Sequence, residues 1–97
     1  MSTYICLMKL TEQGIKNIKD APVRVLAATK ALEAAGGKII GFYTVMGQYD
    51  YVAILEAPSD EVALTQLLGL GRLGDVMTIT LKAFTTDEFS EIVKKVP

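Results

Sequence analysis

The sequence contains no histidine, only one cysteine and no run of like charge longer than two residues. Histidine is the commonest general base and a usual ligand of zinc and haem. Its absence therefore excludes a Ser-His-Asp triad and argues against a zinc or haem centre. Cys6 cannot form a disulfide within the chain or a thiolate metal site on its own, and we expect it to be a small buried hydrophobe. The sequence predicts no metal and no cofactor.

The balance of charge limits the partners in the same way. Ten basic and eleven acidic residues give a formal net charge of -1. Such a chain has no field that would grip a phosphate backbone or an anionic membrane, so we expect neither nucleic acid nor membrane as a partner. No apolar stretch is long enough to span a bilayer, and Met1–Leu10 lacks the layout of a signal peptide. These features, with the single cysteine, predict a cytoplasmic protein.

The length of 97 residues suits one compact domain, which we expect to cover residues 1–97. The hydrophobic share of 51% is high for a small domain, because small domains expose a large fraction of their surface. That excess indicates apolar surface buried against another copy of the chain.

Residue patterns along the chain predict four strands and three helices. The expected strands are Thr3–Leu10, Lys38–Val45, Tyr51–Ala57 and Asp75–Phe84. The expected helices start at Pro22, after Ser59 and at the capping box Thr85–Glu88, and Gly36-Gly37 ends the first of them. The segment from Thr11 to Pro22 is expected to be a polar connection. The order β-α-β-β-α-β plus a C-terminal helix predicts a ferredoxin-like α+β fold, in which two helices cover one face of a four-stranded antiparallel sheet.

The alternation within the strands predicts how the faces are used. We expect the apolar side of the last strand to face the helices: Met77, Ile79, Leu81 and Ala83. The central strands are apolar on both sides, whereas a solvated face should be polar. A homodimer or higher oligomer that packs sheet against sheet would cover the second face. The residues expected in that interface are Tyr4, Met8, Tyr51 and Leu55.

Several segments resemble the GYD domain family. They are Thr11–Gly14, Ile18–Arg24, Gly36–Lys38, Gly47–Asp50, Glu56–Pro58 and Thr78–Phe84. Gly47, Tyr49 and Asp50 match the Gly, Tyr and Asp of the family's name. The resemblance extends as far as Phe84 and implies a dimeric α/β barrel of the ferredoxin-like class, in a family without an established activity. Other proteins with this barrel include monooxygenases and haem-degrading enzymes, but a haem role normally needs an axial histidine.

The segment Gly47–Asp50 permits three interpretations. In the first it is a tight turn in which Asp50 bonds its own backbone and Tyr49 packs at the dimer seam. In the second, Tyr49 and Asp50 lie at the mouth of a cavity and bind a small polar ligand or pass it a proton, while Arg24 anchors an anion or simply pairs with an acid. The third is an RNA-stacking strand, which Tyr49 and Tyr51 fit in spacing. The acid at position 50 and the missing basic residue oppose it.

Two functions follow from these observations. The first is a homo-oligomeric module that has no catalytic activity and holds a small metabolite between its paired sheets. The second is a cofactor-independent enzyme of the dimeric α/β-barrel type, resembling a monooxygenase or an isomerase, that uses Tyr49 and Asp50.

Overall fold

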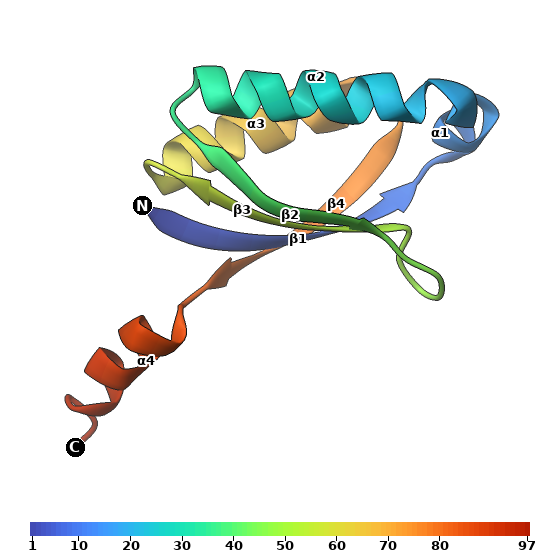
Figure 1. Ribbon diagram of the computed structural model, residues 1–97. Helices are drawn as coiled ribbons and strands as arrows, with labels where there is room; N and C mark the ends of the chain where they lie inside the picture. The colour runs from blue at the N-terminus through green and yellow to red at the C-terminus, as the bar shows by residue number, and fades with distance from the viewer.

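A computed structural model describes residues 1–97 as one four-stranded antiparallel sheet with helices packed on one face (Figure 1). The strands are β1 (Ser2–Leu10), β2 (Lys38–Thr44), β3 (Tyr51–Ala57) and β4 (Val76–Ala83). Their order in the sheet is β2-β3-β1-β4. The ferredoxin-like α+β fold predicted from the sequence is therefore confirmed. Within the single chain the sheet is open, with β2 and β4 at its edges.

The predicted capping residues Ser59 and Thr85 precede two of the helices and Gly36-Gly37 follows another, whereas the helix expected to start at Pro22 begins at Ala21, after an Asp20 whose side chain makes no capping bond. The long helices are α2 (Ala21–Ala34) and α3 (Asp60–Arg72), and the short C-terminal helix is α4 (Thr86–Val93). Gly36 has a φ of 91° after α2, and the Gly37 N–H donates to the Leu32 carbonyl at 2.9 Å. This geometry satisfies carbonyls that the helix end leaves free. The Ser59 hydroxyl accepts from the Val62 N–H at the start of α3.

The segment between β1 and α2 is more ordered than the sequence predicted. It forms a one-turn helix, α1 (Glu12–Lys16), and a 3-10 turn, η1 (Ile18–Asp20), that runs into α2. Thr11 caps α1, because its hydroxyl accepts from the Gly14 N–H. Gly14 was expected to mark a loop, but it serves close packing. A Cβ at Gly14 would lie 2.1 Å from the carbonyl oxygen of Asp75.

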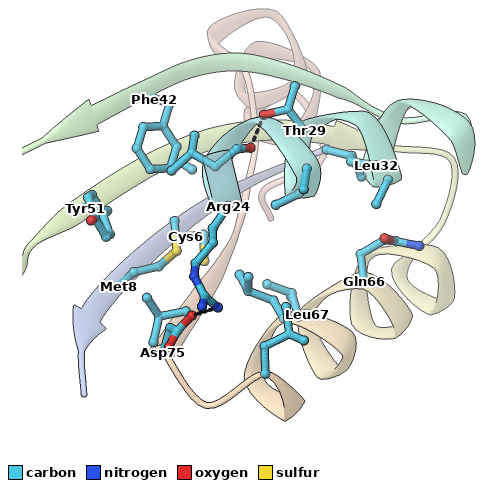
Figure 2. Close-up of a pocket in the computed structure, with 18 of the residues that line it drawn as sticks. Cys6, Met8, Arg24, Thr29, Leu32, Phe42, Tyr51, Gln66, Leu67 and Asp75 are labelled. Carbon is cyan, nitrogen blue, oxygen red and sulfur yellow. Dashed lines mark hydrogen bonds and ion pairs between the residues drawn. The ribbon is translucent and has the colours of Figure 1, made fainter. Parts of the chain in front are cut away.

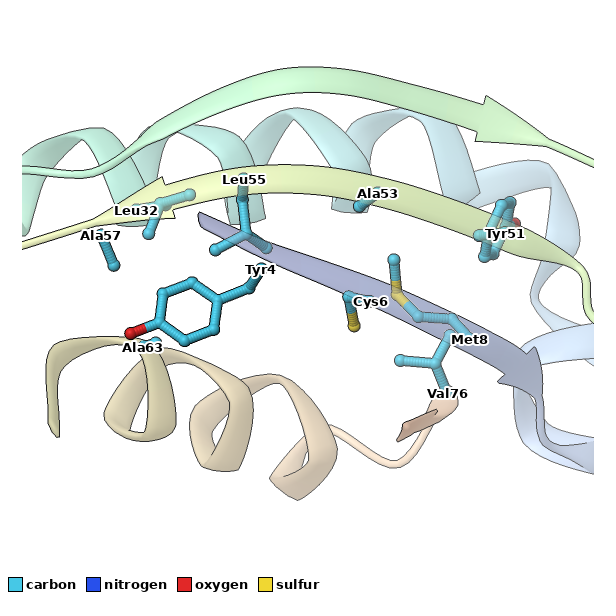
Figure 3. Close-up of a cluster of buried hydrophobic side chains, with 10 residues drawn as sticks. All are labelled: Tyr4, Cys6, Met8, Leu32, Tyr51, Ala53, Leu55, Ala57, Ala63 and Val76. Carbon is cyan, nitrogen blue, oxygen red and sulfur yellow. The ribbon is translucent and has the colours of Figure 1, made fainter. Parts of the chain in front are cut away.

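The core lies between the sheet and the two long helices (Figure 3). Alternate residues of β1 and β3 point into it, which explains the period of two in their burial. The four residues expected in a dimer interface are among these buried side chains: Tyr4, Met8, Tyr51 and Leu55. They lie under the helices of their own chain. The face available to a partner is the opposite one.

The assignment of the faces of β4 was wrong. Thr80 pairs with Cys6 across the β1–β4 ladder, and its hydroxyl donates to the Cys6 Sγ at 3.6 Å, on the helix side. Lys82 points the same way and reaches Asp60 at the start of α3. The polar residues of this edge strand therefore find partners at the margin of α3. Its large apolar residues, Met77, Ile79 and Leu81, are exposed on the face away from the helices.

Candidate functional site

The sheet face away from the helices, here called the open face, carries two apolar rows that cross the strands. Cross-strand pairing aligns the first row as Tyr43, Val52, Leu7 and Ile79. The second row is Gly41, Ile54, Ile5 and Leu81. The residues on the edge strands keep large exposed fractions, with Tyr43 at 60%, Met77 at 70%, Ile79 at 52% and Leu81 at 49%. A continuous apolar surface of this kind is typical of an interaction site.

Charged side chains lie at the ends of the open face rather than in its middle. Lys38 pairs with Glu56 at one end of the sheet, and Lys9 pairs with Met77 at the other. Protein interfaces commonly have such an apolar centre with a polar rim. The open face therefore has the chemical layout of a contact surface.

Helix α4 forms a second apolar surface, which extends away from α2 and α3 (Figure 1). The exposed apolar residues are Phe89, Ile92 and Val93 of α4, together with Val96 just after the helix. A capping box fixes its start, since the Glu88 side chain accepts from the Thr85 N–H and the Thr85 hydroxyl accepts from the Glu88 N–H. The bond from the Thr85 backbone holds the pKa of the Glu88 carboxyl below its usual value. The side-chain bonds and the ion pair of residues 85–97 all stay within that segment.

A cavity of about 430 Å³ lies between α2, α3 and the sheet (Figure 2). Its walls are mainly apolar, and several of the side chains that line it are small. The small ones include Cys6, Ala28, Ala31, Ala53 and Ala63. Because short side chains face each other from both layers, the chain leaves an unfilled space between the helices and the sheet that is open to solvent on one side. This space lies within one chain, whereas the sequence led us to expect a metabolite between two sheets.

An ion pair between Arg24 and Asp75 marks one end of the cavity (Figure 2). Asp75 is buried, and it also accepts from the Gln13 Nε2 at 2.9 Å. The Thr11 N–H donates to the Asp75 carbonyl at 2.9 Å. The segment Thr11–Gly14 therefore caps α1, bonds Asp75 and packs against its backbone. The contacts of these residues therefore give them a structural role.

Asp50 also has a structural part. Its carboxylate accepts from the Leu10 N–H at 2.8 Å, and its own N–H donates to the Met8 carbonyl at 2.9 Å. Gly47 takes a φ of 117° in the connection that leads to it. These bonds fix the loop between β2 and β3 to the end of β1. The segment therefore has a structural role, although the Asp50 carboxylate bonds Leu10 of β1 and not its own backbone as expected for the turn.

The three residues expected at a ligand site do not line one pocket. Arg24 lines the cavity, but Tyr49 and Asp50 do not. Tyr49 is half-buried, and its hydroxyl makes no hydrogen bond within the chain. The structure therefore brings Arg24 together with Asp75 instead, a partner that the sequence patterns did not single out.

Sequence reasoning also missed a polar cluster between α3 and the sheet. The Tyr4 hydroxyl donates to the Asp60 carboxylate, and the Lys82 Nζ lies 3.1 Å from the Asp60 Oδ2. Burial, with the bond to Asp60, raises the pKa of Tyr4, and the bonds from Tyr4 and Lys82 lower the pKa of Asp60. The cluster fastens the start of α3 to β1 and β4. Tyr4 and Lys82 are paired in the ladder, so a correct face assignment for β4 would have brought them together.

None of the helices is long and apolar enough to cross a membrane.

Comparison with known proteins shows which family the chain belongs to. The chain is 33% identical over 84 residues to a glutamine synthetase and cystathionine beta-lyase binding protein of Thermus thermophilus, which covers 86% of this chain and 88% of that relative. The model of the GYD domain matches residues 4–93. This match includes α4, which lies beyond the segments where the sequence resemblance was seen. The chain belongs to the GYD domain family.

Proposed function

We propose that this chain is a binding module without catalytic activity, which pairs with a second copy through its open face and offers α4 to an enzyme. The single observation that carries the proposal is the open face, an apolar surface that no helix of the chain covers. The relative's name adds the kind of partner, since it describes a protein that binds glutamine synthetase and cystathionine beta-lyase.

Self-association suits the open face because its apolar rows cross all four strands. In a two-fold dimer the same patch serves both copies, so the apolar centre of one sheet would cover that of the other. Lys9 and Glu56 would then lie at the rim, where charges remain hydrated. A sheet that is open in one chain would become the wall of a barrel in two.

Helix α4 suits recognition of another protein. An amphipathic helix that lays its apolar side in a groove is a common mode of binding. The capping box of Thr85 and Glu88 stabilises the helix in the free chain, which lowers the entropy cost of ordering it on binding. The apolar side of α4 is not used by the domain itself, since Phe89 and Ile92 stay exposed.

The alternative function, an enzyme that uses Tyr49 and Asp50, has weaker support. The Asp50 carboxylate is held by the Leu10 N–H, and neither Tyr49 nor Asp50 lines the cavity. A general base must reach a substrate with a free lone pair and a suitable pKa. The contacts of Asp50 favour a role in the turn.

Binding to purified enzymes tests the proposal. Glutamine synthetase and cystathionine β-lyase from the same organism would be titrated against the immobilised chain, its Phe89→Glu variant and its Ser90→Glu variant. Ser90 follows Phe89 and lies about 100° around α4 from it, outside the stripe of Phe89, Ile92 and Val93, so the pair adds the same charge on and off that stripe. We expect the wild-type chain and Ser90→Glu to bind at least one enzyme, and Phe89→Glu to bind it at least about tenfold more weakly.

Two outcomes would contradict the proposal. If the wild-type chain binds neither enzyme, the inference drawn from the relative is wrong. If Phe89→Glu binds as well as Ser90→Glu, the enzyme does not dock on α4.

A further inference from the structure

We infer that the cavity between the helices and the sheet binds a small molecule with an apolar body and one head group that accepts hydrogen bonds, as in a medium-chain carboxylic acid or its amide. The site lies inside a single chain, so it does not depend on the proposed dimer or on binding to an enzyme. It is also distinct from the space between paired sheets.

The dimensions and origin of the cavity support a ligand site. Its volume of about 430 Å³ falls within the range of roughly 300–1,000 Å³ that is usual for small-molecule pockets. The space arises because Ala28 and Ala31 of α2 face Cys6 and Ala53 of the sheet. Larger apolar residues at these positions would close it.

The lining determines the body of the ligand. Most of the wall is aliphatic or aromatic, with Met8 and Phe42 on the sheet side and Leu67 on α3 (Figure 2). A polar or multiply charged ligand would lose its hydration against these walls without new hydrogen bonds in return. An extended alkyl or aromatic body would exchange water for apolar contact.

The polar groups of the cavity determine the head of the ligand. Arg24 uses only its Nη1 in the bond to Asp75, so its other N–H groups have no acceptor in the chain. The hydroxyl of Tyr51 likewise has no hydrogen-bond partner in the chain. Asp75 already accepts from Arg24 and Gln13. Arg24 and Tyr51 therefore offer donors without an acceptor in the chain, which match a carboxylate or a carboxamide, while the Asn17 amide in the lining offers both donors and an acceptor.

Arg24 and Asp75 form an ion pair without net charge, so the head group is selected by the guanidinium N–H groups that Asp75 leaves free. A carboxylate can bond the free guanidinium N–H groups of Arg24. An alkylammonium would find only neutral acceptors, such as the Tyr51 hydroxyl and the Asn17 amide, besides an Asp75 carboxylate that Arg24 and Gln13 already contact. We expect alkyl acids and amides to bind and alkylamines of equal length to bind much more weakly.

The four methionines allow this site to be tested directly. Met8 lines the cavity, Met77 lies on the open face, and Met46 is exposed in the loop between β2 and β3. The protein labelled with ¹³C at its methionine methyl groups would be titrated with decanoate, decanamide and decylamine, each below its micelle concentration. We expect decanoate and decanamide to shift the Met8 methyl signal saturably, to leave Met77 and Met46 unchanged, and to bind at least about tenfold more tightly than decylamine.

Two variants of α2 control for non-specific binding. Ala28→Leu places a larger side chain in the cavity and should abolish the shift of Met8. Ala34→Leu makes the same change at an exposed position of the same helix that does not line the cavity, and it should bind as the wild type does.

Three results would overturn the inference. A shift of Met77 without Met8 would place the ligand on the open face, and no shift of Met8 with any probe would mean that the cavity takes no such ligand. Decylamine binding as tightly as decanoate would refute the assignment of the head group. If the titration with the two enzymes shows no binding, the ligand titration should still give the expected shift of Met8, because the cavity does not depend on α4.

Discussion

Substitution of Ala28 by leucine should stabilise the protein, contrary to the usual effect of enlarging a core residue. Enlarging a residue in a filled core costs about 1–3 kcal/mol, because neighbours must move. Ala28, however, faces the cavity of about 430 Å³, which has room for the added atoms. Leucine adds three carbon atoms, worth about 0.8 kcal/mol each when buried, and loses roughly 0.5–1 kcal/mol of side-chain entropy. The free energy of unfolding should rise by about 1.5 kcal/mol.

The prediction can be measured by urea denaturation and by thermal unfolding. For a domain of this size the expected gain corresponds to a rise of roughly 6–12 °C in Tm. Ala34→Leu is the matched control, and it should change the free energy of unfolding by less than about 0.5 kcal/mol, because Ala34 is exposed. A destabilised Ala28→Leu variant would show that the layers leave no usable space, and the cavity would then not be a site for any ligand.

Further predictions concern packing, pH and thiol reactivity. Gly14→Ala should lower the free energy of unfolding by about 3 kcal/mol in denaturation, because its Cβ would lie 2.1 Å from the Asp75 carbonyl oxygen. In Gly71→Ala the added Cβ meets nothing within 4 Å in α3, so this variant should be more stable by about 0.5–1 kcal/mol. Equal effects of the two substitutions would contradict this account of Gly14. Because the pKa of Glu88 is lowered in the folded chain, its carboxylate contributes its full stabilisation of α4 at pH values above the usual pKa of 4.5. This stabilisation is lost as the pH falls through the lowered pKa of the folded state. Backbone chemical shifts of α4 should therefore report fraying in acid for the wild type, and a Glu88→Gln variant with the same acid fraying would refute the assignment. Cys6 is buried, and burial raises the pKa of its thiol, so a bulky, charged thiol reagent that the apolar cavity does not admit should react only when the protein unfolds; rapid reaction of such a reagent with the folded protein would contradict this.

The sequence predicts most of the architecture because its local signals agree with one another. Gly36-Gly37, Ser59 and the capping box at Thr85 mark helix ends that the structure confirms. The helix α1 was missed because Gly14 is equally compatible with a loop and with close packing. Only the distance to the Asp75 backbone distinguishes the two, and this contact joins residues far apart in the sequence.

The faces of the sheet could not be predicted from alternation alone. A period of two separates two sets of side chains but does not say which set meets the helices. In β4 the choice depends on Thr80 and Lys82, whose partners Cys6 and Asp60 come from distant segments. For a monomer, the apolar side chains of β4 would be expected to face the core. The exposure of Ile79 and its neighbours is the observation on which the proposed pairing of two copies rests.

The same limit applies to the candidate site. Arg24 was identified from its charge and position, and it does line the cavity. Its partner Asp75 was not identified, because the sequence pattern makes Asp75 the first residue of a predicted strand. In the segment Gly47–Asp50, the Asp50 backbone and carboxylate are hydrogen-bonded to Met8 and Leu10 of β1. The segment that matches the family's name therefore fastens the end of β1, whereas alanines that carry no sequence motif form much of the cavity wall.

The central claim, that the open face joins two copies, is tested most directly by sedimentation equilibrium on the wild type, Ile79→Lys and Leu68→Lys. Ile79 lies in the open face, whereas Leu68, 65% exposed, lies on α3. In a two-fold dimer each substitution counts twice. Loss of two half-exposed isoleucines, at roughly 1 kcal/mol each, weakens the dimer by about 30-fold before the cost of burying lysine is added.

We predict a dimer for the wild type and for Leu68→Lys, and a folded monomer for Ile79→Lys. A monomeric wild type, or an Ile79→Lys variant that dimerises as strongly as the wild type, would contradict the account.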